Sequence, residues 1–135
     1  MAEFQRSFSG APWEERVGYC RSLRAGELVF VTGTASVAEG GGVHAVGDGY
    51  GQALRCFEII REALAAHGAD MRDVVRTRMF VTDIERWEEY GRAHQETFGA
   101  HPPTTTMVEV SRLIDPAMLI EIEADAVVEG GTSPS

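Results

Sequence analysis

Two glutamates in a β-rich segment have a spacing that suits acid–base chemistry. Glu121 and Glu123 stand at positions i and i+2 of residues 119–128, in which apolar and acidic residues alternate. In a strand, their side chains would lie on one face, about 7 Å apart. A carboxylate in a partly closed cleft has a raised pKa and can exchange a proton with water. The same pattern fits a strand face that is solvated or paired with arginines, so both interpretations stay open.

A glycine at the end of another predicted strand is a second candidate for chemistry. Gly33 lies between Thr32 and Thr34, directly after a run of apolar residues. A glycine at such a point lets a ligand approach the backbone, whose N–H can bind an oxyanion. The run of glycines at positions 40–42 lacks the dinucleotide-binding fingerprint and predicts only a flexible loop.

The histidines and cysteines give weaker signals. None of the four histidines is spaced with a second histidine or a cysteine as a zinc site requires, so we expect no metal. His94 is expected to pack in the core. Cys20 lies near Arg21, which could lower the pKa of its thiol, but an inert core thiol is the other interpretation. Cys20 and Cys56 could form one disulfide, and two buried thiols in a reducing cytoplasm is the interpretation that we favour.

Composition excludes several classes of protein. The 12 basic residues are all arginine, against 21 acidic residues, which gives a net charge of −9 over 135 residues. Without lysine there is neither a Schiff-base amine nor a phosphate-binding loop of the Walker type. The negative charge argues against binding to nucleic acid. The apolar runs are too short to cross a membrane and no signal peptide is visible, so we expect a cytoplasmic protein.

Periodicity predicts one α+β domain. Residues 1–16 are expected to form an irregular arm, residues 17–24 and 27–32 a β-hairpin, and residues 130–135 a disordered tail. A helix is predicted from Tyr50 to about Leu64, with Asp48 as its cap and Gly68 beyond its end. A strand over 74–82 has one face made of alternate residues: Val75, Thr77, Met79 and Val81.

The second half of the chain continues this alternation of elements. Asp83 is expected to cap a second helix, which ends at Gly99, and strands follow over 104–111 and 119–128. The buried stripe of this helix is predicted to be Trp87, Tyr90, His94 and Phe98. The order β-β-α-β-α-β-β gives a mixed sheet with two helices on one face. The other face carries arginines and acids, and it is either solvated or meets copies of itself.

Several short motifs together resemble the RidA (YjgF) reactive-intermediate deaminase family over residues 17–128, nearly the whole chain. The residues that carry the resemblance are Gly18-Tyr19-Cys20-Arg21, Phe30-Val31-Thr32-Gly33, Gln52-Ala53, Asp73-Val74-Val75, Val81-Thr82-Asp83 and Ile120-Glu121-Ile122-Glu123-Ala124. The resemblance implies a chorismate-mutase-like fold with a six-stranded sheet. It also implies a homotrimer with small-molecule clefts between subunits, and chemistry without a metal or organic cofactor. Residues 1–16 would then be an arm before this domain and residues 129–135 a tail after it.

The resemblance also implies an activity and a set of site residues. Family members hydrolyse enamines and imines, such as 2-aminoacrylate, to a keto acid and ammonia. Their cleft takes a tyrosine and a serine-glycine pair from one subunit, and an arginine, a cysteine and a glutamate from the neighbour. The matching positions here are Tyr19, Thr32, Gly33, Thr105, Met107 and Glu121.

This sequence departs from the family pattern where the substrate carboxylate would bind. Thr105 stands in place of the arginine and cannot form a bidentate pair with a carboxylate. Met107 replaces the cysteine, and Gly91 replaces a common helix asparagine. The chain therefore resembles a subgroup that lacks the substrate-binding arginine, and we do not expect a standard 2-aminoacrylate deaminase.

Two explanations for the missing arginine are open. Arg21 shares a strand face with Tyr19 and could anchor an anion, or it could be a surface arginine paired with Glu27 or Asp125. Otherwise the ligand has no carboxylate and contacts Trp87, Thr105 and Met107.

Three kinds of function remain open on the sequence. The first is a hydrolase of an imine, an enamine or a related small molecule, in which Glu121 positions water and the backbone at Gly33 orients the substrate. The others are a non-catalytic ligand-binding or regulatory trimer, and a chaperone-like role. Some relatives carry a ribonuclease label, against which the negative charge argues.

Overall fold

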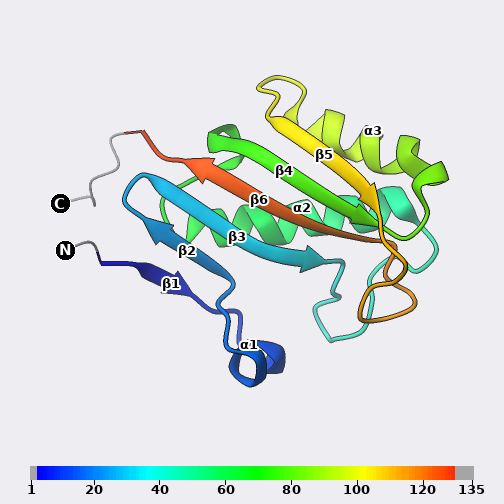
Figure 1. Cartoon of the computed structure of the whole chain (residues 1–135), viewed down its shortest axis with the longest axis horizontal. Helices are drawn as coiled ribbons and strands as arrows, with labels where there is room; N and C mark the ends of the chain where they lie inside the picture. The colour runs from blue at the N-terminus through cyan, green and yellow to red at the C-terminus, as the bar shows by residue number, and fades with distance from the viewer. Residues whose placement is uncertain (1–2, 130–135) are drawn as a thin grey trace.

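The computed structural model describes residues 3–129, which form a six-stranded mixed sheet with helices (Figure 1). The strands are β1 (Gln5–Ser7), β2 (Ser22–Ala25), β3 (Leu28–Ala35), β4 (Val74–Val81), β5 (Thr104–Glu109) and β6 (Ile120–Val127). The helices are α1 (Pro12–Val17), α2 (Gly49–Ala65) and α3 (Trp87–Phe98), with 3₁₀ turns at Met71–Asp73 and Ile84–Arg86. The strand order is β1-β2-β3-β6-β4-β5, and only β4 and β5 are parallel among these pairs. The α+β fold and the six-stranded sheet are thus confirmed.

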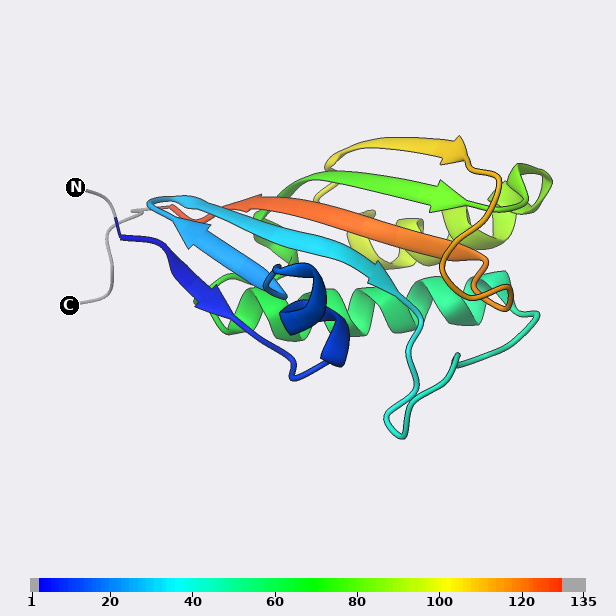
Figure 2. The same cartoon turned by 60° about the horizontal axis from the view of Figure 1, so that its bottom comes forward.

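The two long helices cover one face of the sheet (Figure 2). α2 packs against β3 and β6, and it buries its apolar stripe, which includes Phe57, Ile60 and Leu64. From β6, Ile120 and Ile122 face the same core. The Asp48 carboxylate accepts a hydrogen bond of 2.9 Å from the Gly51 N–H, as expected for a helix cap. No helix within residues 3–129 is long and apolar enough to span a membrane.

The opposite face of the sheet carries charged and exposed apolar side chains. Arg78 on β4 pairs with Asp125 at 3.2 Å and with Glu123 at 3.6 Å, both on the neighbouring β6. Phe30 and Val75 are exposed on strands of the sheet. Within one chain, therefore, the arginine of this face pairs with its acids, and apolar area remains uncovered.

The N-terminal segment is not the irregular arm that we predicted. β1 adds to the edge of β2, and α1 begins at Pro12 with Glu14 and Glu15 in its first turn. Proline at a helix start and acids near its positive end both favour this helix. Gly18 then takes a φ of 90°, which ends α1 and turns the chain, so that the strand predicted over 17–24 begins only at Ser22. Of the predicted tail, residues 130–135 lie outside the described residues.

The side-chain orientations predicted for one strand and one helix are also wrong in part. A register shift between Val74 and Arg76 in the pairing of β4 with β6 removes Val75 from the face predicted for it: Val75 is exposed, whereas Thr77, Met79 and Val81 are buried. Trp87, predicted to be buried, is 56% exposed. The reason is that Asp83 caps a 3₁₀ turn and the α-helix starts only at Trp87, beyond the end of the buried stripe. Strand β5 ends at Glu109, earlier than predicted.

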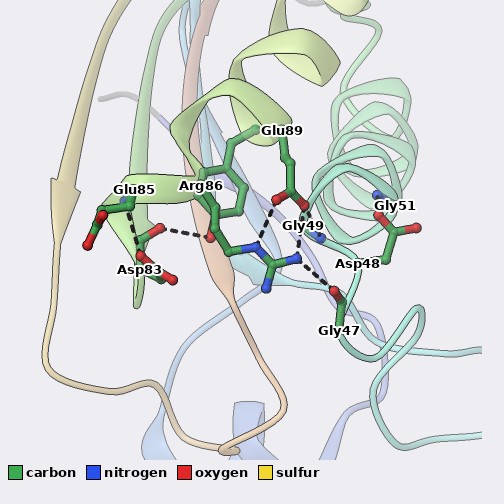
Figure 3. A network of polar contacts seen from close by, with 9 residues as sticks. Gly47, Asp48, Gly49, Gly51, Asp83, Glu85, Arg86 and Glu89 are labelled. Carbon is green, nitrogen blue, oxygen red and sulfur yellow. Dashed lines mark hydrogen bonds and ion pairs between the residues drawn. The ribbon is translucent and has the colours of Figure 1, made fainter.

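A polar network joins the starts of α2 and α3 (Figure 3). Arg86 donates a hydrogen bond of 2.7 Å to the Gly47 carbonyl and two of 2.9 Å to the carboxylate of Glu89. The Gly49 N–H donates to the same carboxylate at 3.1 Å. A Cβ at Gly49 would lie 2.8 Å from a ring carbon of Tyr90, so close packing of the two helices requires a glycine here.

Candidate functional site

A β-bulge in β3 creates the centre of the candidate site. Val31 pairs with Ala124 and Thr34 pairs with Ile122, so Thr32 and Gly33 together stand opposite a single residue of β6. The Thr34 hydroxyl donates a hydrogen bond of 2.8 Å to the Thr32 carbonyl across the bulge. Bulges of this kind redirect backbone groups and are frequent beside active sites.

The side chain of Arg21 lies against this bulge. Its Nη2 donates hydrogen bonds to the carbonyls of Thr32, at 3.1 Å, and Gly33, at 2.9 Å. Its Nε is buried and has no partner among the described residues. Burial lowers the pKa of this guanidinium, and the carboxylate of Glu14 is the strongest of the groups that oppose the shift. Arg21 therefore fixes the backbone of the bulge, and the predicted pairing with Glu27 or Asp125 is not found.

The carboxyl group of Glu121 lies directly beside Gly33. A Cβ at Gly33 would overlap Glu121 Oε2 and would lie 3.2 Å from Cδ, so only glycine leaves room for this approach. Burial raises the pKa of Glu121, Glu123 adds to the rise, and the cation of Arg21 opposes it. A carboxyl group with a raised pKa, held against an exposed backbone segment, suits proton transfer to and from water or a bound substrate.

These groups line one cleft of about 380 Å³. Its apolar wall includes Trp13 of α1 and Ile114 and Met118 of the segment before β6. The predicted site residues that line it are Tyr19, Arg21, Thr32, Gly33 and Glu121. The cleft thus combines one cation, one proton-transfer group and an apolar wall, which suits a small organic ligand.

A larger hollow of about 640 Å³ adjoins the cleft on the open face of the sheet. Tyr19 and Thr32 line both spaces, but neither Arg21 nor Glu121 lines the larger one. Since Arg21 and Glu121 face the smaller cleft, we take that cleft as the candidate site.

The remaining predicted residues lie elsewhere in the chain. Gly91, Thr105 and Met107 line a separate groove of about 370 Å³ between α3 and β5. Trp87 is not among the residues that line this groove, although its ring would be 3.7 Å from a Cβ at Gly91. The resemblance implies that the glutamate comes from a neighbouring subunit, whereas Glu121 lies beside Gly33 of its own chain.

One buried acid at the cleft was missed from the sequence. Glu14 is only 5% exposed, and its carboxylate accepts hydrogen bonds from the Ser9 N–H, at 3.0 Å, and from the Ser9 hydroxyl. Because residues 1–16 were predicted to be an irregular arm, Glu14 was not considered as a site residue. The signal available was Pro12 followed by two glutamates, a pattern typical of the first turn of a helix.

The cysteines and histidines form no centre of their own in residues 3–129. Cys56 and Cys20 are free, the former buried and the latter partly exposed. Burial strongly raises the pKa of the Cys56 thiol, as expected for an inert core cysteine. Within the same residues, no group of three or more His, Cys, Asp or Glu side chains is placed to hold a metal ion.

Comparison with known proteins gives a consistent result. The sequence model of the family described as endoribonuclease L-PSP matches residues 11–128. An uncharacterized protein of Streptomyces coelicolor is 36% identical over 122 residues, which is 90% of each chain. The 3-aminoacrylate deaminase RutC of Acinetobacter baylyi is 29% identical over 82% of this chain and 86% of its own. A crystal structure of a YjgF/YER057c/UK114 family member from Mycobacterium tuberculosis superposes with a TM-score of 0.85 at 44% identity, covering 93% of this chain and all of that one.

The fold and the bulge-centred cleft therefore define an α+β protein of the YjgF type, built on one mixed sheet. More particularly, the chain belongs to the endoribonuclease L-PSP family, which is the YjgF/RidA superfamily. This family includes a relative named as a 3-aminoacrylate deaminase.

Proposed function

We propose that this protein hydrolyses small imines or enamines in the cleft beside the β3 bulge, with Glu121 as the proton-transfer residue. The observation that carries the proposal is the placement of a buried carboxyl group with a raised pKa directly against Gly33. The relative named as a 3-aminoacrylate deaminase supports this class of reaction.

In the proposed reaction, water adds to the C=N carbon of the imine. Glu121 accepts a proton from the water as the C–O bond forms and passes it to the imine nitrogen, which gives a carbinolamine. Glu121 then takes the proton of the carbinolamine hydroxyl and delivers it to nitrogen as the C–N bond breaks. The products are a carbonyl compound and ammonia, so that imine plus water balances without an oxidant or a cofactor. The raised pKa of Glu121 favours both halves of this proton transfer, because the group then binds a proton more readily than an ordinary glutamate. Arg21 holds the Thr32 and Gly33 carbonyls, and so keeps the substrate-facing backbone in place.

We propose that the working form is a homotrimer in which the α3–β5 groove of one subunit completes the cleft of the next. The uncovered sheet face, with its exposed Phe30 and Val75, supplies apolar area for such an assembly. Since both cysteines are free, we place the trimer in the reducing cytoplasm.

The family description mentions an endoribonuclease, but we do not propose RNA as the substrate. The net charge of −9 opposes the binding of a polyanion, and the cleft itself contains Glu14 and Glu121.

The test is ammonia release from imines that an amino-acid or amine oxidase generates in situ, with wild type compared with Glu121→Gln. We expect the variant to lose about 10²- to 10⁴-fold in rate, the usual contribution of a general acid–base group. Glu62→Gln, an exposed change on α2, is the matched control and should keep the full rate. The acid limb of the pH profile should lie above the ordinary glutamate value of 4.5 and should vanish in Glu121→Gln.

The second candidate function is a non-catalytic ligand-binding or regulatory trimer. The apolar wall of the cleft, with Trp13, Ile114 and Met118, favours it, because such a wall can hold a ligand without chemistry. A wild-type protein that releases no ammonia above the spontaneous rate, and that retains a small molecule through purification, would overturn the enzymatic proposal.

A further inference from the structure

A chain of three hydrogen-bonding side chains lies beneath the α3–β5 groove. The Thr77 hydroxyl of β4 is 2.8 Å from His94 Nε2 on α3 and 2.7 Å from the Thr105 hydroxyl on β5. Thr77 is fully buried, whereas Thr105 is exposed at the groove. The chain therefore connects the half-buried imidazole of His94 to the hydroxyl at position 105, where the resemblance to the family implies an arginine.

The donors of this chain can be counted. A threonine hydroxyl carries one proton, so Thr77 can donate to only one of its two partners. Its hydroxyl donates to Thr105, so His94 must donate from Nε2, and the Thr105 proton is then free to point into the groove. Thr105 therefore presents a fixed, neutral hydrogen-bonding group.

The groove around Thr105 contains no formal charge. Its lining, within residues 3–129, includes Met79, Phe98, Pro103 and Met107 but no Asp, Glu or Arg. Burial lowers the pKa of His94, so its imidazole is neutral at pH 7. The groups that pack on it are uncharged: Phe57 of α2, Phe98 of α3 and Thr77 of β4.

The cleft that this groove would complete has no spare positive charge either. Its one arginine, Arg21, uses Nη2 on two backbone carbonyls and faces the carboxyl groups of Glu14 and Glu121. A substrate carboxylate needs charged or multiple donors to replace its water. The groove has no cation, and of Arg21 the Nη2 is held by backbone carbonyls and the Nε is buried.

We infer that Thr105, oriented by Thr77 and His94, makes this site selective for uncharged imines, that is, for substrates with an apolar group and no carboxylate. Thr105 supplies one hydrogen bond to a neutral oxygen or nitrogen of the substrate, and the methionines and Phe98 of the groove contact its apolar part. Thr77 is a positioning residue, because it is fully buried and acts only through its two partners, whereas His94 both orients the chain and lines the groove. The inference rests on the proposed function, in which groove and cleft meet between subunits.

The experiment compares two imines made in situ. One is the uncharged aryl aldimine that an amine oxidase forms from benzylamine, and the other is the α-imino acid that an amino-acid oxidase forms from phenylalanine. We expect wild type to have the higher kcat/KM on the aldimine. Thr105→Val should lower that value about 3- to 10-fold, the usual effect of one lost neutral hydrogen bond, and Thr105→Ser should restore it. Thr105→Arg should raise the rate on the imino acid about tenfold or more.

Controls separate this inference from the proposed function. Thr106→Val, the next residue of the same strand, should change neither rate. Nitrogen NMR of the imidazole should show that Thr77→Val alters the tautomer or pKa of His94, and that Thr105→Val does so more weakly. If Glu121→Gln abolishes both activities while Thr105→Val changes no preference, this inference fails and the proposed function stands. If Glu121→Gln leaves both rates intact, the proposed function fails, and this inference with it.

Discussion

Gly33→Ala is the change that most directly tests the geometry of the site. The added methyl would overlap Glu121 Oε2 and would lie 3.2 Å from Cδ. An ordinary carbon–oxygen or carbon–carbon contact needs about 3.5 Å, so the carboxyl group must move away by about 1 Å. Gly33 is not among the glycines with positive φ, so alanine fits the backbone without strain.

The effects on stability and on activity should therefore differ. The atoms that must move are the end of a flexible side chain, so the movement costs little. Alanine also lowers the conformational entropy of the unfolded chain, which stabilises the folded protein by about 0.4–1 kcal/mol. We expect the free energy of unfolding to change by less than about 1 kcal/mol. A shift of about 1 Å in a reacting group can cost about 10²-fold in rate, and we expect a loss of that order in kcat/KM.

The assay combines urea unfolding with ammonia release from the aryl aldimine. Gly40→Ala is the control, because Gly40 has nothing within 4 Å of its Cβ position and no positive φ. It should keep both stability and rate. Full activity in a folded Gly33→Ala protein would refute the assignment of Glu121 beside Gly33 as the reacting pair. A large loss of stability would show instead that the carboxyl group cannot move.

Three further predictions concern stability and reactivity. Burial lowers the pKa of His67 in the folded protein below its ordinary 6.5. The unfolded chain therefore binds more protons than the folded protein as the pH falls below 6.5. The contribution of His67 to stability is full above pH 6.5 and is lost as the pH drops toward the folded-state pKa. The urea midpoint should show this fall, and His67→Gln should reduce it. Ellman's reagent should titrate Cys20 in the native protein, and Cys56 only after unfolding; rapid reaction of both would contradict the buried position of Cys56. Gly49→Ala should lower the free energy of unfolding by about 1–3 kcal/mol, because its Cβ would lie 2.8 Å from Tyr90, and an unchanged melting temperature would contradict this packing.

The spacing of apolar residues in the sequence correctly predicted the strands and helices in which buried residues recur at one regular interval. The alternation of β6 placed Ile120 and Ile122 in the core, and the helical spacing around Phe57 and Ile60 placed α2. Prediction failed where a local irregularity changed the period. The register shift beside Val75 separated this residue from the strand face predicted for it, and the 3₁₀ turn before Trp87 left a predicted core residue at the surface.

The N-terminal segment failed for a different reason. β1 is three residues long and gains its hydrogen bonds only by pairing with β2, so no periodic signal marks it in the sequence. Glu14, whose carboxylate is held by Ser9 in the same N-terminal segment, was missed together with it.

By itself, the sequence determined the order of the strands and long helices from β2 onward, the absence of lysine chemistry and the presence of threonine at position 105, since these follow from residue identity and local period. Only the tertiary structure decided which residues meet. Glu121 reaches Gly33 because β6 pairs with β3 across a bulge, and Thr105 is joined to His94 because β4, β5 and α3 converge on Thr77. Such contacts depend on strand register and helix packing between segments far apart in the chain, which a local pattern does not specify.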